Sequence, residues 1–239
     1  MSRANQAYMK QMPAALLGLV LLLSPKAATA QQYGDFEYTN NGNAVTITDY
    51  TGNGGAVTIP STINGLPVTI IGGVAANAFA GSIGLVSVTI PSSVSQIGWQ
   101  AFVGCSALTN VFFLGNAPDA DPGGSVFLGD PNATVYYLPG TTGWDWQPFG
   151  RPPLGYPNYE YLPAVLWNPR AQSPALRSGQ FSFDITGTPD IPIVIEAATN
   201  LTNGAWVPLQ TGLLSGGLLH FADPSWTSFP ARFYRIRWP

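Results

Sequence analysis

Residues 71–113 read IGGVAANAFAGSIGLVSVTIPSSVSQIGWQAFVGCSALTNVFF and contain one pattern twice. The pattern I-G…A-F-x-G-x-x-x-L-x-x-V begins at Ile71 and again at Ile97, and its A-F-x-G parts, at Ala78 and Ala101, are 23 residues apart. A period of about 20–29 residues with one short strand per copy is typical of a leucine-rich solenoid. Because one copy cannot bury its own apolar face, the copies are expected to stack around a shared core.

The repeat continues outward from this stretch in both directions. The string V-T-I-P occurs at Val57 as well as at Val88, and a degenerate last copy includes Val135. We therefore predict four stacked strands, which begin at Val57, Val88, Val111 and Val135. Before them, residues 36–47 are expected to form a capping hairpin, because the turn at 40–43 is rich in Asn and Gly, which tolerate positive φ.

These repeats resemble a known family. The strings Val88–Val94, Ile97-Gly98, Ala101-Phe102 and Leu108-Thr109 are closely similar to the BspA-type leucine-rich repeats of bacterial surface and secreted proteins. The resemblance extends over about residues 34–145. It implies a β-solenoid that serves binding, adhesion or surface architecture rather than catalysis.

Residues 1–30 have the order of parts of a secretory signal peptide. Arg3 and Lys10 form a charged start, residues 14–23 are an apolar run, and Ala28-Thr29-Ala30 is a cleavage site of the A-x-A type. The run is too short to span a bilayer as a helix. We therefore predict an exported protein, either secreted, on the cell surface or periplasmic, whose mature chain begins at Gln31 and has no transmembrane anchor.

Composition narrows the class of protein further. Glycine (27) and proline (22) are abundant and only 9% of residues are charged, which excludes coiled coils and helical bundles. The predicted mature chain keeps no lysine and is acidic. Nucleic acids and anionic lipids require a basic face, so neither is an expected partner.

The second half of the chain follows a different pattern. Residues 143–176 are predicted as a cap and linker, because prolines in this segment interrupt helix and central strand. Short strands with turn signals between them return in 177–239 and are typical of a small antiparallel sandwich. The fold class is therefore all-β (mainly β), with residues 31–142 as the solenoid and 177–239 as a sandwich-like domain. Strings around Ile195–Leu201 and Arg232–Arg235 resemble a C-terminal β-module of exported bacterial proteins, which implies an accessory or attachment role.

Aromatic residues are concentrated after the last repeat. They fit two explanations, which are closure of the last repeat and stacking against sugar rings. Their position directly after the repeat favours closure. The candidate ligand-stacking residues are Trp144, Trp146, Tyr156, Tyr159 and Tyr161.

Three further features of the sequence are candidate sites. Asp119, Asp121 and Asp130 occupy positions 1, 3 and 12 of a calcium-type loop, but position 5 is glycine, so a solvated connection between repeats is favoured. His220, the one histidine, alternates with apolar residues and is predicted to lie on a sheet surface. Cys105, the one cysteine, stands where another repeat has a small residue and is predicted to be buried. No cofactor is predicted.

These observations predict an exported, non-enzymatic protein that binds, adheres or builds structure at the cell surface through its solenoid, with a protein or a glycan as partner. The alternative is a carbohydrate-binding accessory protein that uses the aromatic segment. A secreted hydrolase is the third hypothesis, and it requires carboxylates such as Asp35 and Glu37, or Asp184 and Asp190, to converge in one pocket.

Overall fold

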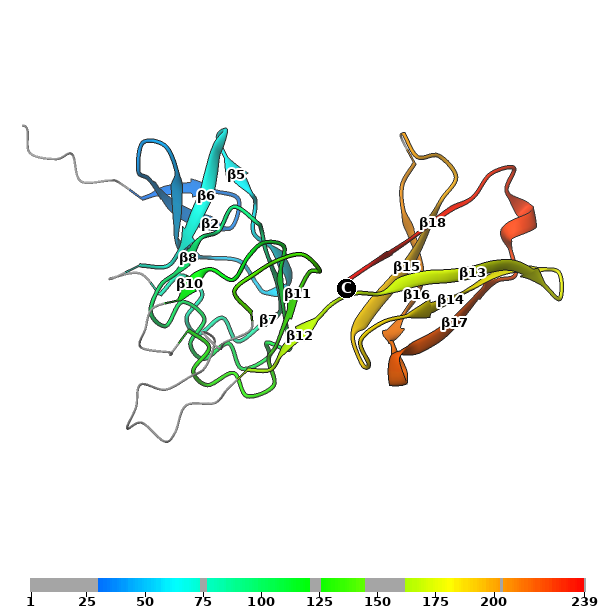
Figure 1. Cartoon of the computed structure of the whole chain (residues 1–239). Coiled ribbons are helices and arrows are strands. Elements are labelled where there is room, and N and C mark those ends of the chain that lie inside the picture. Colours follow the sequence, from blue (N-terminus) through cyan, green and yellow to red (C-terminus); the bar gives the residue numbers. More distant parts are fainter. Residues whose placement is uncertain (1–29, 74–76, 121–125, 145–161, 203, 239) are drawn as a thin grey trace, which may run out of the picture.

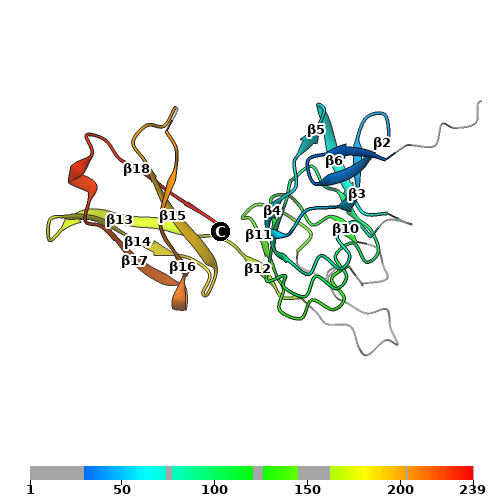
Figure 2. The same ribbon diagram turned by 180° about the vertical axis from the view of Figure 1, so that it is seen from behind.

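The structure, a computed structural model, describes residues 30–73, 77–120, 126–144, 162–202 and 204–238. In these residues the chain is β structure with two short 3₁₀ turns, and no helix is long and apolar enough to cross a bilayer. Figure 1 shows two units side by side, a solenoid (β1–β12) and a C-terminal sandwich (β13–β18), with β12 and the C-terminus between them. Figure 2 shows the same arrangement from behind.

One side of the solenoid is a parallel sheet in the order β12-β11-β9-β7-β4. Its strands are β4 (Gly55–Thr58), β7 (Leu85–Ile90), β9 (Asn110–Phe113), β11 (Thr134–Tyr137) and β12 (Ala164–Leu166). Val57 pairs with Val88, Val88 with Val111 and Val111 with Val135. The four predicted strands are therefore confirmed as neighbours with these valines in one row, although each strand begins one to three residues earlier than predicted.

A second side begins with the N-terminal cap. Its strands are β1 (Gln31–Tyr33), β2 (Phe36–Asn40), β3 (Val45–Tyr50), β5 (Thr62–Ile63), β6 (Leu66–Ile71), β8 (Gln96–Ile97) and β10 (Asp119–Ala120). The β2–β3 pair is antiparallel, as the predicted hairpin requires, and β3, β6, β8 and β10 then run parallel. Short backbone ladders, such as Phe79 N–H to the Ala101 carbonyl (2.7 Å), form the remaining side.

A ladder of aromatic rings fills the interior of the solenoid. Phe79, Phe102 and Phe127 occupy the same position in successive repeats, and their ring centroids are 4.7 and 5.2 Å apart. Tyr50 extends the stack at the N-terminal end, 4.9 Å from Phe79. Each ring is buried by its neighbours in the two adjacent repeats, so no repeat is stable by itself.

Part of the segment 143–176, which was predicted as a cap and linker, forms a strand at the end of the solenoid. Ala164, Val165 and Leu166 form β12, which pairs with β11 and adds a fifth strand to the sheet. Ala164 and Val165 continue the rows that run through Val135 and Tyr136. This short strand was not predicted, because the many prolines of the segment indicated a linker. Residues 145–161 lie outside the described residues.

The C-terminal sandwich consists of two antiparallel sheets, ordered β13-β14-β17 and β16-β15-β18. The strands are β13 (Arg170–Arg177), β14 (Gln180–Thr186), β15 (Pro192–Ala198), β16 (Val207–Leu213), β17 (Leu218–Asp223) and β18 (Phe233–Arg237), with 3₁₀ turns η1 (Ser215–Gly217) and η2 (Trp226–Ser228). Phe183, Ile185 and Phe221 from one sheet and Ile193 and Ile195 from the other form its core. All of strand β13 except Arg177 lies within the segment predicted as linker.

The two units share a small apolar interface. Phe112 of β9 and Tyr136 of β11 stack at 5.1 Å on the outer face of the solenoid sheet. Trp238 stacks on Phe112 at 5.8 Å and meets Trp167 edge-on at 5.2 Å. The Trp167 indole N–H donates to the carbonyl of Pro192 at 2.8 Å. The sandwich therefore covers part of the outer sheet face, at β9 and β11.

Candidate functional site

The densest group of charges lies on the outer face of the sheet β16-β15-β18. Glu196 is in the central strand β15, between Ile195 and Ala197, which are buried, and strand alternation turns its carboxylate to the opposite face. Arg235 of β18 is its direct cross-strand partner, and Arg237 follows two residues later. We call these three residues the Arg–Glu–Arg cluster.

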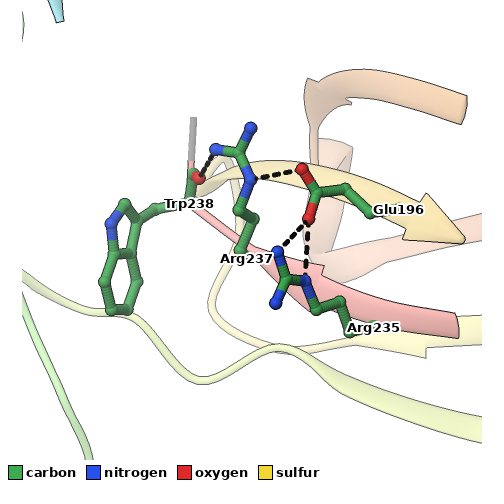
Figure 3. Close-up of polar contacts among 4 residues, drawn as sticks. All are labelled: Glu196, Arg235, Arg237 and Trp238. Carbon is green, nitrogen blue, oxygen red and sulfur yellow. Dashed lines mark hydrogen bonds and ion pairs between the residues drawn. The ribbon is translucent and has the colours of Figure 1, made fainter. Parts of the chain in front are cut away.

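The Arg–Glu–Arg cluster is fully hydrogen-bonded around its carboxylate (Figure 3). Nε and Nη2 of Arg235 both lie 2.7 Å from Oε2, and Nε of Arg237 lies 2.7 Å from Oε1. Arg237 Nη1 also donates to the Trp238 carbonyl at 2.5 Å, next to the contact between the two units. The Arg235 guanidinium lies 4.3 Å from the ring centroid of Trp206, a cation–π contact.

The charges in the cluster are unequal in exposure. The Glu196 side chain is only 5% exposed, whereas those of Arg235 and Arg237 are 46% and 41% exposed. Burial by itself raises the pKa of Glu196, but hydrogen bonds and charges from Arg237 and Arg235 outweigh it and hold this pKa below its ordinary value. The carboxylate is therefore ionised at neutral pH, and the cluster has one net positive charge.

Neutralising the buried carboxylate is expected to destabilise the sandwich in a pH-dependent way. Because the folded pKa of Glu196 is lowered, its stabilisation is present above the ordinary glutamate pKa and is lost as pH falls through the folded value. Glu196→Gln should lower the free energy of unfolding by about 2 kcal/mol at pH 7, and the difference from wild type should shrink below about pH 4. Urea unfolding of wild type and variant between pH 7 and about pH 4 or below measures the loss of stability and its dependence on pH. The exposed Asp190→Asn is the control for loss of one negative charge, and an equal, pH-independent effect of both variants would contradict the prediction.

Two other polar groups lie in the sandwich. His220 Nδ1 is 2.7 Å from Asp184 Oδ1, and Arg177 is 3.7 Å from the other carboxylate oxygen. The hydrogen bond from His220 lowers the pKa of Asp184. His220 is exposed on a sheet surface, as predicted, but its partner was not foreseen, because it depends on the β14–β17 register.

The second group is centred on a buried carboxylate. Asp223 is 4% exposed and accepts from Tyr234 Oη at 2.9 Å, and Arg232 Nε lies 2.8 Å from the same oxygen. Burial and the hydrogen bond to Asp223 both raise the pKa of Tyr234. This group ties β17 to β18 across the two sheets and is a structural crosslink.

The candidate calcium loop is only partly described. Asp119 belongs to β10, which pairs with β8, and Asp130 is 1% exposed at a corner of the solenoid. Because Asp121 lies outside the described residues, the connection between repeats that was favoured over a calcium site stays a prediction. Among the described residues, no group of three or more His, Cys, Asp or Glu side chains is placed to hold a metal ion.

Trp144 lies in the core of the solenoid and not on its surface. It is 6% exposed, stacks on Tyr137 at 5.1 Å, and lies 5.0 Å from the ring of Phe113. Its indole N–H donates to Thr141 Oγ1 at 2.9 Å. The candidate role of Trp144 as a sugar-stacking residue is therefore incompatible with its position, because both neighbours cover the ring. The other four candidates, Trp146, Tyr156, Tyr159 and Tyr161, lie outside the described residues.

Cys105 is buried, as predicted. It is 0% exposed, and its Sγ lies 3.1 Å from the carbonyl oxygen of Phe79. Ser82 and Asp130 occupy the same corner in neighbouring repeats, since each of the three carbonyls accepts a backbone N–H from three residues later. Burial, with a contribution from the Asp130 charge, raises the pKa of Cys105 to about 12.

This environment predicts an unreactive thiol. The native protein should resist thiol reagents at neutral pH and react only after denaturation, because the thiolate is disfavoured and the sulfur is covered. Cys105→Ala should cost about 1 kcal/mol of unfolding free energy, since only a small apolar group is lost. Labelling kinetics followed by mass spectrometry test the first point, and fast labelling of folded protein would contradict it.

The two units differ in charge. Residues 31–144 contain six acidic residues and no lysine, arginine or histidine. Glu37 and Asp49 lie directly opposite each other in the β2–β3 pair, an arrangement of like charges that destabilises a sheet. The sandwich, by contrast, contains all the arginines of the described residues. They are Arg170, Arg177, Arg232, Arg235 and Arg237.

Comparison with known proteins finds few matches. No family model matches the chain, and no curated protein matches it. A leucine-rich cell surface protein from Faecalibacterium prausnitzii A2-165 is 27% identical, with a TM-score of 0.36, and the match covers 45% of this chain and 30% of that one. The chain thus covers less than a third of that protein's length.

Two further solved structures are similar to part of the chain. The T. pallidum leucine-rich repeat protein is 22% identical, with a TM-score of 0.31, over 46% of this chain and 71% of that one. The pneumococcal vaccine antigen PcpA is 16% identical, with a TM-score of 0.28, over 46% of this chain and 40% of that one.

Proposed function

We propose that this protein is an exported, non-enzymatic binding protein that attaches to a partner at the cell surface through its solenoid. The observation that supports this most is the charge of the solenoid, whose residues 31–144 are exclusively acidic or neutral. A surface of one sign attracts a partner of the opposite sign and speeds their encounter. The partner expected is therefore a protein, or a glycan, with a positively charged surface.

The N-terminal hairpin is the part of this surface where the negative charges lie closest together. Glu37 and Asp49 face each other across β2 and β3, and Asp35 lies in the turn between β1 and β2. A cationic group placed beside Glu37 and Asp49 would relieve their repulsion. Removal of these two charges is therefore expected to weaken binding and to raise the stability of the hairpin. Residues with a purely structural role would not show this combination.

Location of the protein tests export. Cell fractionation of a tagged chain should recover it outside the cytoplasm, and mass spectrometry should find an N-terminus at Gln31, because Ala28 and Ala30 satisfy the small-residue rule for cleavage. An intact Met1 on the recovered protein would contradict export by this route.

Rebinding to cells tests the role of the hairpin. Purified protein should bind to cells that lack its gene, and binding should weaken as salt screens the charges. The variant Glu37→Gln/Asp49→Asn should lose most of this binding while it folds at least as stably as wild type. Asp190→Asn, which removes an exposed carboxylate of the sandwich, should bind normally. Unchanged binding by the double variant would contradict the proposed surface.

A further inference from the structure

A cavity of about 590 Å³ opens between the two sheets of the sandwich. Strands β13 and β18 are each at the edge of their sheet, and residues of both strands line the cavity. Its volume lies within the range of pockets that bind small molecules, roughly 300–1,000 Å³. Because the cavity belongs to the sandwich, it is distinct from the acidic surface of the solenoid.

The walls of the cavity are mainly apolar and aromatic. Phe181 and Phe183 of β14 and Tyr234 of β18 line it, and the rings of Phe181 and Tyr234 stack with their centroids 4.9 Å apart. Along β18 the lining extends from Arg232, directly before the strand, to Ile236, which is about 13 Å at the rise of an extended strand. An elongated apolar cavity fits an extended alkyl chain better than a compact ring system.

The ionised side chains of the lining carry one sign of charge. They are Arg232 and Arg235, and no carboxylate is among the described residues that line the cavity. The charge of Arg232 is balanced by Asp223, whereas Arg235 belongs to the Arg–Glu–Arg cluster, which has one net positive charge. An excess of positive charge beside an apolar cavity favours a ligand with an anionic group.

Arg232 has a hydrogen-bond donor without an acceptor. Its side chain is only 11% exposed, and its Nε is buried with no hydrogen bond in the part of the chain that the structure describes. Because this nitrogen lies 2.8 Å from Asp223 Oδ2, the missing hydrogen bond indicates that its N–H is not aimed at that oxygen. Buried donors are nearly always paired, and a guanidinium can bind both oxygens of a carboxylate through parallel N–H groups. The free donor therefore points to a carboxylate ligand.

We propose that this cavity binds a medium-chain fatty acid, with its alkyl chain between β13 and β18 and its carboxylate on Arg232. The chain would cover the apolar walls at Phe181 and Tyr234 and remove them from water. The carboxylate would accept hydrogen bonds from the Arg232 guanidinium, and the charge of Arg235 would add to the attraction. Since both parts of the ligand contribute, neither an uncharged chain nor a short acid should bind well.

Isothermal titration calorimetry of the purified chain with decanoate tests the proposal. Decanoate should bind at one site per chain. Decanol, which has the same chain and no charge, should bind about 10- to 100-fold more weakly, because it cannot form charge-assisted hydrogen bonds. Acetate, which has the charge and no chain, should show no binding. Absence of decanoate binding, or decanol that binds as tightly as decanoate, would overturn the proposal.

Two variants test where the ligand lies. Arg232→Gln should weaken decanoate binding about 10- to 100-fold and leave that of decanol nearly unchanged. Ala171→Trp, which places a large ring in the cavity, should abolish binding of both. The controls are Arg177→Gln, which changes an arginine of β13 that is 47% exposed and does not line the cavity, and Gln172→Trp, whose ring would lie on the other face of β13. Both controls should bind decanoate like wild type.

Circular dichroism melting establishes that each variant is folded. If Arg232→Gln does not fold, Ala171→Trp and Gln172→Trp still decide, because both substitutions are on an edge strand. Decanoate binding that survives Ala171→Trp, or that is lost equally in Gln172→Trp, would overturn the proposal. Affinity that falls as the protein concentration rises would show that a second copy of the chain occupies the cavity, and this result too would overturn it.

Discussion

Phe102→Ala is expected to lower the free energy of unfolding of the solenoid by about 4 kcal/mol. Phe102 is 0% exposed and lies between two other rings, 4.7 Å from Phe79 and 5.2 Å from Phe127. Its removal leaves a cavity in the middle of the stack and exposes a ring face in both adjacent repeats. Because repeats are stabilised by their neighbours, the loss should affect the whole solenoid.

Urea unfolding followed by circular dichroism measures this effect. The matched control is Ile83→Ala in the preceding repeat, since Ile83 is 72% exposed and should change stability by less than about 0.5 kcal/mol. Phe102→Leu, which keeps most of the volume, should lose clearly less than Phe102→Ala. Equal stability of Phe102→Ala and Ile83→Ala would show that the aromatic ladder does not hold the repeats together.

Trp144→Ala is expected to cost about 3 kcal/mol or more, because Trp144 closes the last repeat of the solenoid. Its ring is buried against Tyr137 and Phe113, and its N–H bonds to Thr141. Without it, a cavity would remain beside Tyr137 and Phe113 in the last repeat. An end repeat without a cap is the weakest part of a solenoid.

Two variants separate packing from hydrogen bonding at this position. Trp144→Phe keeps much of the ring contact and loses only the bond to Thr141, so it should recover about half of the stability. Trp99→Ala, which removes an indole that is 46% exposed, should change stability little and serves as the control. A fully stable Trp144→Ala would mean that other residues close the solenoid.

The sequence predicted the parts of this fold that depend on neighbouring repeats. Successive copies of a repeat place equivalent residues side by side, so the row through Val57, Val88, Val111 and Val135 could be predicted from the recurring motif even where insertions lengthen the spacing. The burial of Cys105 followed in the same way, from its alignment with Ser82. In a solenoid each repeat packs against the next copy along the chain, so the spatial neighbours of a residue can be predicted from the repeat.

Contacts that join distant strands were decided by the tertiary structure alone. Glu196 meets Arg235 and Arg237 about 40 residues later, and His220 meets Asp184 across a strand pair. Antiparallel pairing depends on loop lengths and on which face is buried, and a shift of one residue would have turned each side chain to the other face. The sequence alone could not specify these registers.

The same division applies to the surface of the molecule. Composition and pattern were enough to show that residues 31–144 are free of basic groups and to predict a repeat unit followed by an antiparallel unit. Three features depend on packing between distant segments: Trp238 covers Phe112, Ala164–Leu166 adds a fifth strand, and β16 lies at a sheet edge. The physical reason is that composition and period are properties of a segment, whereas burial and exposure are set by the segments that pack against it.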